Sequence, residues 1–147
     1  MKIIIGGGTF HQVRYIFIFF IILLPACASV SFERIEGSDF KESLPGLWEG
    51  SWKATAHQGN QYIKITKVEG SEVHLTGLMK GGATDPDTDE VYGRIENSML
   101  LLTWPAALDS GCKEKYKMTR DASNKLRLDG NQVCGSYVST VSLFKKE

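Results

Sequence analysis

From Gly46 to the C-terminus, short runs of β-branched and aromatic residues alternate with turn residues at intervals of about ten. This rhythm is typical of antiparallel sandwiches and barrels, because each strand is short and each hairpin needs a turn. We therefore expect an all-β domain over residues 46–147. Eight strands are predicted: Leu47–Ala56, Gln61–Val68, Glu72–Met79, Glu90–Ile95, Met99–Trp104, Lys115–Arg120, Lys125–Asp129 and Ser136–Lys145.

The connections between these strands indicate their topology. Glu69–Ser71, Glu96–Ser98 and Ala122–Asn124 are short enough for hairpins, so consecutive strands should pair antiparallel. Eight strands in this order can close on themselves and leave no exposed edge. The predicted fold is an antiparallel eight-stranded up-and-down barrel. Alternation sets its inner face: in the sixth strand Tyr116 and Met118 point away from Lys115 and Lys117.

Two cysteines, Cys112 and Cys134, lie just before the sixth and eighth predicted strands. The third cysteine, Cys27, follows the N-terminal apolar run and is assigned to lipid below, which leaves an even pair in an exported chain, so we expect a disulfide between Cys112 and Cys134. In an up-and-down barrel both positions fall at the same end, which is consistent with this pairing. Closing their separation of 22 residues would stabilise the fold by roughly 3 kcal/mol. A metal site would need further ligands, and the only histidines after residue 26, His57 and His74, are distant in sequence.

The first predicted strand opens with Gly46-Leu47-Trp48, a G-x-W pattern. It resembles the start of the first strand in the calycin superfamily, which includes the lipocalins and the avidins. The resemblance implies a small barrel in which Trp48 plugs the closed end. Trp48 and Trp52 share one face of the strand, with Gly50 between them. Together with Tyr116 and Met118 they could line a ligand cavity, or form a filled core in which Gly50 leaves room for a neighbouring ring; a filled core is favoured.

The N-terminus has the composition of a leader peptide. Lys2 and Arg14 are basic, and Tyr15–Leu24 is an apolar run of ten residues. Ten residues form about 15 Å of helix, roughly half of a hydrocarbon core, so the run fits a signal peptide better than a membrane span. Leu24-Pro25-Ala26-Cys27 follows and resembles the lipobox of bacterial lipoproteins.

The lipobox resemblance implies cleavage of residues 1–26, diacylglycerol on the sulfur of Cys27, and acylation of its new α-amino group. Ala28 lacks the charge of an inner-membrane retention signal, so the outer membrane, on its periplasmic side, is the expected location. The alternative is an ordinary secretory peptide that leaves Cys27 free. Residues 27–45 are interpreted as a tether, in which Phe32, Ile35 and Phe40 could form a helical turn or pad the barrel end.

Charge and composition exclude some functions. Removal of residues 1–26 removes two basic residues and no acidic one, which leaves 15 basic and 17 acidic groups. A net charge near −2 gives no electrostatic basis for nucleic-acid binding. The acidic stretch Asp85–Glu90, with Glu96 eleven residues after Asp85, has EF-hand-like spacing, but Glu90 stands where that loop needs glycine. We expect no metal and no cofactor.

No catalytic motif places His57 or His74 beside a nucleophile and an acid, so we do not expect an enzyme. The leading hypothesis is a membrane-anchored, periplasm-facing lipoprotein whose barrel binds a small apolar ligand or a protein partner. The alternative hypothesis is an interaction module without a cavity, such as an envelope assembly factor or a lysozyme inhibitor.

Overall fold

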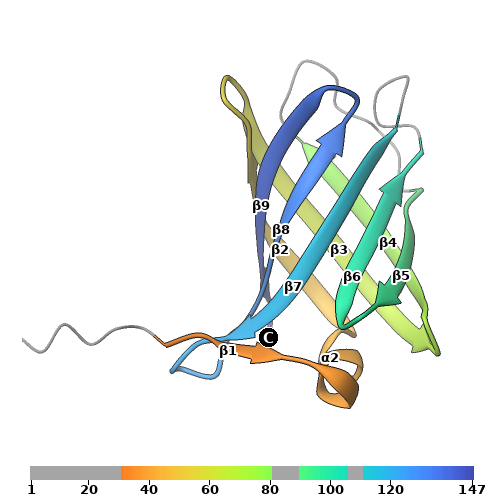
Figure 1. Ribbon diagram of the computed structural model, residues 1–147, viewed down its shortest axis with the longest axis vertical. Helices are drawn as coiled ribbons and strands as arrows, with labels where there is room; N and C mark the ends of the chain where they lie inside the picture. Colours follow the sequence, from red (N-terminus) through yellow and green to blue (C-terminus); the bar gives the residue numbers. More distant parts are fainter. Residues whose placement is uncertain (1–30, 81–89, 106–110) are drawn as a thin grey trace, which may run out of the picture.

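The computed structural model describes residues 31–80, 90–105 and 111–147. These residues form a closed, antiparallel, eight-stranded up-and-down barrel with one extra strand, as Figure 1 shows. The barrel closes because its first strand pairs with its last, and the predicted all-β fold is thereby confirmed. The elements in chain order are β1 (Glu33–Ile35), α2 (Gly37–Ser43), β2 (Gly46–Lys53), β3 (Gln58–Glu69), β4 (Glu72–Lys80), β5 (Tyr92–Glu96), β6 (Met99–Trp104), β7 (Cys112–Arg120), β8 (Leu126–Cys134) and β9 (Tyr137–Lys145).

The eight predicted strands all exist, and most differences lie at their ends. The fifth prediction, Met99–Trp104, has the same bounds as β6. The first strand ends at Lys53 instead of Ala56, because the Ala54 N–H donates to the His57 carbonyl at 2.8 Å and begins the hairpin. Strands β7 and β8 both extend beyond the predicted bounds, to Cys112 and Cys134.

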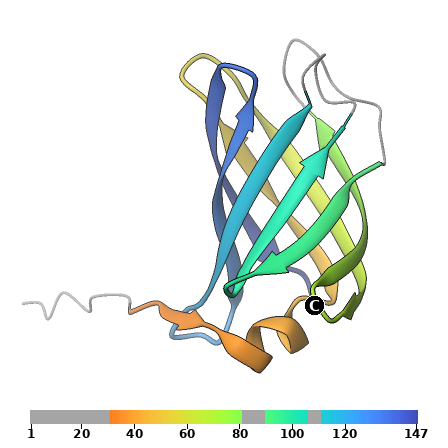
Figure 2. The same cartoon turned by 45° about the vertical axis from the view of Figure 1, so that its right-hand side comes forward.

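Residues 33–44, which the sequence suggests are part of a tether, cover one end of the barrel (Figure 2). Strand β1 pairs with β7 from Glu33 opposite Arg120 to Ile35 opposite Met118, and α2 follows it. Phe40 of α2 and Leu44 after it are fully buried. We call this end, closed by residues 33–44, the plugged end. The structure combines the two possibilities for this segment, because Phe40 lies in the helix α2 and, like Ile35, is buried at the barrel end, whereas Phe32 is exposed.

Side chains from both barrel termini hold α2 in place. The indole N–H of Trp48 donates to the Leu44 carbonyl at 2.8 Å, and the Lys145 ammonium donates to the Ser43 carbonyl at 2.7 Å. A cation suits the carbonyl groups that a helix leaves free at its C-terminus. Partial burial lowers the pKa of Lys145 below its ordinary value. The plugged end is therefore built from the start of β2, the end of β9 and α2.

At Gly50 the backbones of β2 and β9 lie too close together for a side chain on β2. A Cβ atom at this position would lie 1.9 Å from the Ser142 carbonyl oxygen and 2.8 Å from the Leu143 Cα atom. The space beside Gly50 is thus occupied by the backbone of β9, and not by a neighbouring aromatic ring as the filled-core interpretation suggested. Only glycine fits without separating β2 from β9.

Gly50→Ala is expected to lower the free energy of unfolding by about 2 kcal/mol, because backbone atoms cannot move aside as a flexible side chain can. Chemical denaturation of the variant and the wild type measures the difference. Ser51→Ala is the matched control, since Ser51 is exposed on the same strand. Equal stability of Gly50→Ala and the wild type would contradict the close approach of β2 and β9.

Candidate functional site

The interior of the barrel holds all four aromatic and sulfur-containing residues singled out from the sequence. Trp48, Tyr116 and Met118 have no exposed surface, and Trp52 is 8% exposed. Side chains that line a cavity large enough for a ligand would have surface that water can reach. These four side chains have almost none, so the part of the barrel around them is a packed core.

A polar cluster lies within this core, and we call it the Glu114 cluster. The Gln61 side-chain amide donates to the Glu114 Oε2 atom at 2.8 Å and to the Tyr116 hydroxyl at 3.0 Å. The Tyr116 hydroxyl donates to the same Oε2 atom at 2.9 Å. The Gln132 amide donates to the Glu114 Oε1 atom at 2.8 Å and contacts the Met79 sulfur at 3.1 Å. One carboxyl group therefore joins three strands across the barrel.

Burial dominates the electrostatics of this cluster. Loss of water raises the pKa of Glu114, although nearby donors from Trp104, Gln61, Tyr116 and Gln132 act in the opposite direction. Burial, and then the Glu114 charge, raise the pKa of Tyr116 well above its ordinary value. The indole N–H of Trp104 is near the carboxylate but does not form a regular hydrogen bond with it. With both carboxylate oxygens occupied, Glu114 is placed to hold the core together.

In the part of the chain that the structure describes, three buried polar atoms of the interior have no hydrogen-bond partner: Trp52 Nε1, Gln61 Oε1 and Trp104 Nε1. The Trp104 ring lies against Gly77, where a Cβ atom would be 2.3 Å from it. Unpaired buried polar groups are costly, so these atoms could bind a polar ligand group. A ligand would first have to displace the side chains that fill the space.

The open surface of the barrel offers more room than its interior. A furrow of about 1260 Å³ crosses the outer face from β4 to β8, and most side chains along it point outward. A second hollow of about 550 Å³ begins on the other side of Lys115 and extends over β8 and β9. Outward residues of the furrow include Tyr92, Leu101, Thr103, Lys113, Lys115 and Val133.

Lys113, Lys115 and Lys117 form a row along the outer face of β7, and we call it the lysine row. All three are exposed, and no carboxylate of the described residues forms an ion pair with them. The alternation of β7 puts these lysines outside and Glu114, Tyr116 and Met118 inside. The furrow therefore combines exposed lysines with exposed apolar side chains.

Exposed large apolar side chains gather at both ends of the barrel. Tyr92, Val133, Tyr137 and Val138 lie toward the end opposite the plug, as the pairing of Cys134 with Tyr137 and of Val133 with Val138 indicates. Phe32, Leu47 and Phe144 belong to the plugged end. Isolated exposed apolar residues are ordinary, whereas grouped ones often mark contact surfaces.

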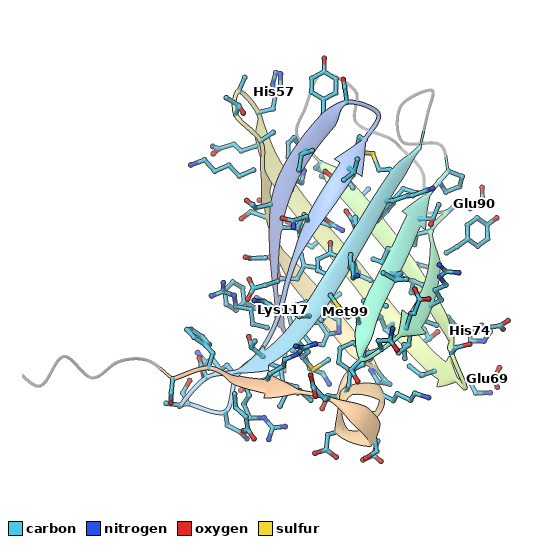
Figure 3. All side chains as sticks on the ribbon, viewed as in Figure 1. His57, Glu69, His74, Glu90, Met99 and Lys117 are labelled. Atoms are coloured by element: carbon cyan, nitrogen blue, oxygen red, sulfur yellow. A yellow bond between two sulfur atoms is a disulfide. The ribbon has the colours of Figure 1, made fainter. Side chains whose placement is uncertain are left out.

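The two histidines considered for catalysis lie in different parts of the barrel, as Figure 3 shows. His57 is exposed in the β2–β3 hairpin, and His74 faces outward on β4, where its Nε2 atom is 3.1 Å from a Glu69 oxygen. Lys67 and His74 lower the pKa of Glu69 by hydrogen bonding. The structure brings neither histidine to the Glu114 cluster.

The acidic stretch Asp85–Glu90 lies outside the described residues except for Glu90, which accepts a hydrogen bond from the Tyr92 hydroxyl. Glu96 belongs to β5 and forms an ion pair with Arg94. The described part of the chain contains no group of histidine, cysteine and acidic residues suited to a metal ion. Within that same part, no helix is long and apolar enough to cross a membrane.

Sequence reasoning missed three members of the Glu114 cluster as site residues: Gln61, Glu114 and Gln132. Glu114 and Gln132 fell outside the predicted strands because a charged or amide residue looks like the end of a strand. One signal could have found Glu114. Continuing the inward alternation of Tyr116 and Met118 backward reaches Glu114 and then Cys112.

The predicted disulfide is confirmed, since Cys112 and Cys134 pair across β7 and β8.

Comparison with protein-family models, with curated proteins and with solved structures gives no match for this chain. The fold alone therefore defines its class: a small closed antiparallel barrel with a plugged end, a packed polar cluster inside and a basic furrow outside.

Proposed function

We propose that the protein is a lipid-anchored, periplasm-facing interaction module of the bacterial cell envelope. In this proposal the barrel is a rigid scaffold, and the furrow across β4 to β8 binds a protein partner. The observation that carries it is the contrast between the two faces of the wall. The inward side chains of Trp48, Trp52, Tyr116 and Met118 leave almost no accessible surface, whereas a hollow of about 1260 Å³, lined mostly by outward side chains, lies on the outer face.

The chemistry of the furrow favours an acidic, extended segment as the partner. Lys113 and Lys115 form no ion pair with any carboxylate of the described residues, and they lie on a mature chain whose net charge is near −2, so positive charge is concentrated locally. Tyr92, Leu101 and Val133 supply apolar contacts beside the lysines. Apolar contacts with complementary charge around them are typical of specific protein interfaces.

The anchor is proposed from the leader sequence, in which an apolar run ends at Leu24-Pro25-Ala26-Cys27. The disulfide supports this assignment indirectly, because Cys112 and Cys134 satisfy each other and leave Cys27 for another role. Replacing Cys27 by serine should release the protein from the membrane fraction. Mass spectrometry of the mature N-terminus should find acyl chains on the wild type.

A photo-crosslinking amino acid at Thr103, within the furrow, should capture a partner in cells. Ser51, on the outer face of β2, is the control position, from which we expect no such adduct. Lys113→Glu combined with Lys115→Glu should reduce the Thr103 adduct about tenfold, because reversing two interfacial charges opposes an acidic partner. Quantitative blotting of the adducts measures this loss.

Lys53→Glu combined with Lys80→Glu is the matched control for charge, since both residues are exposed, on β2 and β4, and neither lines the furrow. This control should leave the Thr103 adduct unchanged. An adduct that survives reversal of the furrow lysines, or that is lost equally in the control, would rule out the furrow as an acidic-partner site.

A small ligand in the interior is the second candidate function, and the unpartnered Trp52 Nε1, Gln61 Oε1 and Trp104 Nε1 atoms favour it. The resemblance to calycins points the same way. Binding there would change tryptophan fluorescence and raise the melting temperature. A panel of lipids and hydrophobic ligands that changes neither would eliminate this candidate.

A further inference from the structure

We propose that the plugged end of the barrel rests on the membrane surface, so that the opposite end faces away from the bilayer. The contact surface is the plugged-end patch, formed by Phe32, Leu47, Arg127 and Phe144. Its partner is the headgroup region of the membrane that carries the anchor. This inference rests on the proposed lipidation of Cys27.

The length of chain between the anchor and the fold limits where the barrel can lie. Phe32 lies five positions after Cys27, and an extended chain covers at most about 3.6 Å per position. Phe32 must therefore lie within about 18 Å of the acylated residue. Strand β9 has nine residues and spans about 30 Å, so the end opposite the plug lies beyond this reach.

The plugged-end patch is continuous across neighbouring strands. Phe144 on β9 pairs with Arg127 on β8 on one side and with Glu49 on β2 on the other. Leu47 adjoins Lys146, whose backbone N–H donates to the Leu47 carbonyl at 2.8 Å. Phe32, Leu47 and Phe144 are 50%, 43% and 48% exposed.

Arg127 gives the patch the mixed character of a membrane interface. Its guanidinium carbon is 5.5 Å from the Phe32 ring centroid and 5.7 Å from that of Phe144. Asp129 accepts from the same guanidinium at 2.6 Å, so the local charge is partly balanced. Lys64, opposite Leu47 in the β2–β3 register, adds an exposed cation. Aromatic rings and basic groups at one level suit the headgroup region.

Docking by this patch would fix the orientation of the proposed partner site. The lysine row extends from Lys117 near the plugged end to Lys113 near the opposite end. Tyr92, Val133 and Tyr137 would point away from the membrane, where a periplasmic protein can reach them. A flexible anchor alone would leave the barrel free to tumble.

Fluorescence quenching by brominated lipids can test this orientation with the acylated protein. The protein is purified from bacterial membranes and reconstituted into vesicles of phosphatidylethanolamine and phosphatidylglycerol with brominated acyl chains. Phe144→Trp places a reporter in the patch, and Tyr137→Trp places the matched control on the same strand at the opposite end. The native tryptophans are buried in both variants and contribute the same background.

We expect the bromine-dependent loss of emission to be roughly twofold greater for Phe144→Trp than for Tyr137→Trp, because interfacial groups lie close to the acyl boundary. Phe32→Trp should be quenched as strongly as Phe144→Trp. It is a second reporter in the patch, so the result does not depend on the folding of one variant. Equal quenching at both ends in acylated protein that floats with vesicles would overturn the docking and leave the anchor intact. Protein that carries no acyl mass and does not float would refute the anchor, and the docking with it.

Discussion

Replacing Cys112 and Cys134 together by serine is expected to lower the free energy of unfolding by about 3 kcal/mol. The disulfide closes a separation of 22 residues, so its loss gives the unfolded chain many more conformations. It joins the start of β7 to the end of β8, where the two strands meet the end opposite the plug. For a domain of this size the melting temperature should fall by about 12 °C, measured by calorimetry or circular dichroism.

Cys27→Ser is the matched control for the cysteine substitutions. It removes a cysteine outside the barrel, so detergent-solubilised Cys27→Ser should unfold like the wild type. Reduction of the wild type should reproduce the effect of the double substitution. If the double variant unfolds at the same denaturant concentration as the oxidised wild type, the disulfide does not contribute to stability.

The barrel fold was predictable because the sequence patterns that specify it lie within short segments of the chain. Alternation of inward and outward residues, together with short turns, specified eight strands and their antiparallel order. Met99–Trp104 was placed correctly because turn residues precede it and Pro105 follows it. The disulfide was predictable because Cys112 and Cys134 are the pair of cysteines left when Cys27 is assigned to the lipobox, and strand order puts both at one end of the barrel.

The plug was only partly predictable because its stability comes from distant residues. The segment around α2 has seven helical residues, too few for a stable isolated helix, and its hydrophobic residues show no sustained period. Phe40 and Leu44 become buried only when β2 and β9 have met and supplied Trp48 and Lys145. The sequence could suggest that Phe40 packs against the barrel end. It could not show that Trp48 and Lys145 would hydrogen-bond to the carbonyl groups at the end of α2.

The extent of β8 was mispredicted for a related reason. Asp129, Gly130 and Asn131 have low strand preference and look like a turn in isolation. In the barrel they pair with β7 on one side and with β9 on the other. Hydrogen bonding to a partner strand on each side outweighs the low strand preference of these three residues. Strand β8 therefore continues to Cys134 and places Gln132 in the Glu114 cluster.

Replacing Glu114 by alanine is expected to lower the free energy of unfolding by about 4 kcal/mol, because three buried donors lose their acceptor. These donors are the side chains of Gln61, Tyr116 and Gln132. Glu114→Gln is the matched control, since it keeps the volume and one acceptor oxygen while the neighbouring amides can turn over to accept its new donor. Urea denaturation of both variants and the wild type measures the difference.

The pH dependence separates this structural role from a simple packing defect. Burial raises the pKa of Glu114 in the folded protein above the ordinary value of 4.5, so the folded state retains a proton that the unfolded state loses. The wild type should therefore lose stability relative to Glu114→Gln as the pH rises from about 4.5 through the folded-state pKa, and the difference should be constant outside that window. A difference that is independent of pH would mean that stabilisation of the ionised carboxylate by its donors balances its destabilisation by burial, and one that grows in favour of the wild type would mean that the donors dominate. The sign of that slope thus decides whether the desolvation of Glu114 or its hydrogen bonds dominates in the barrel core.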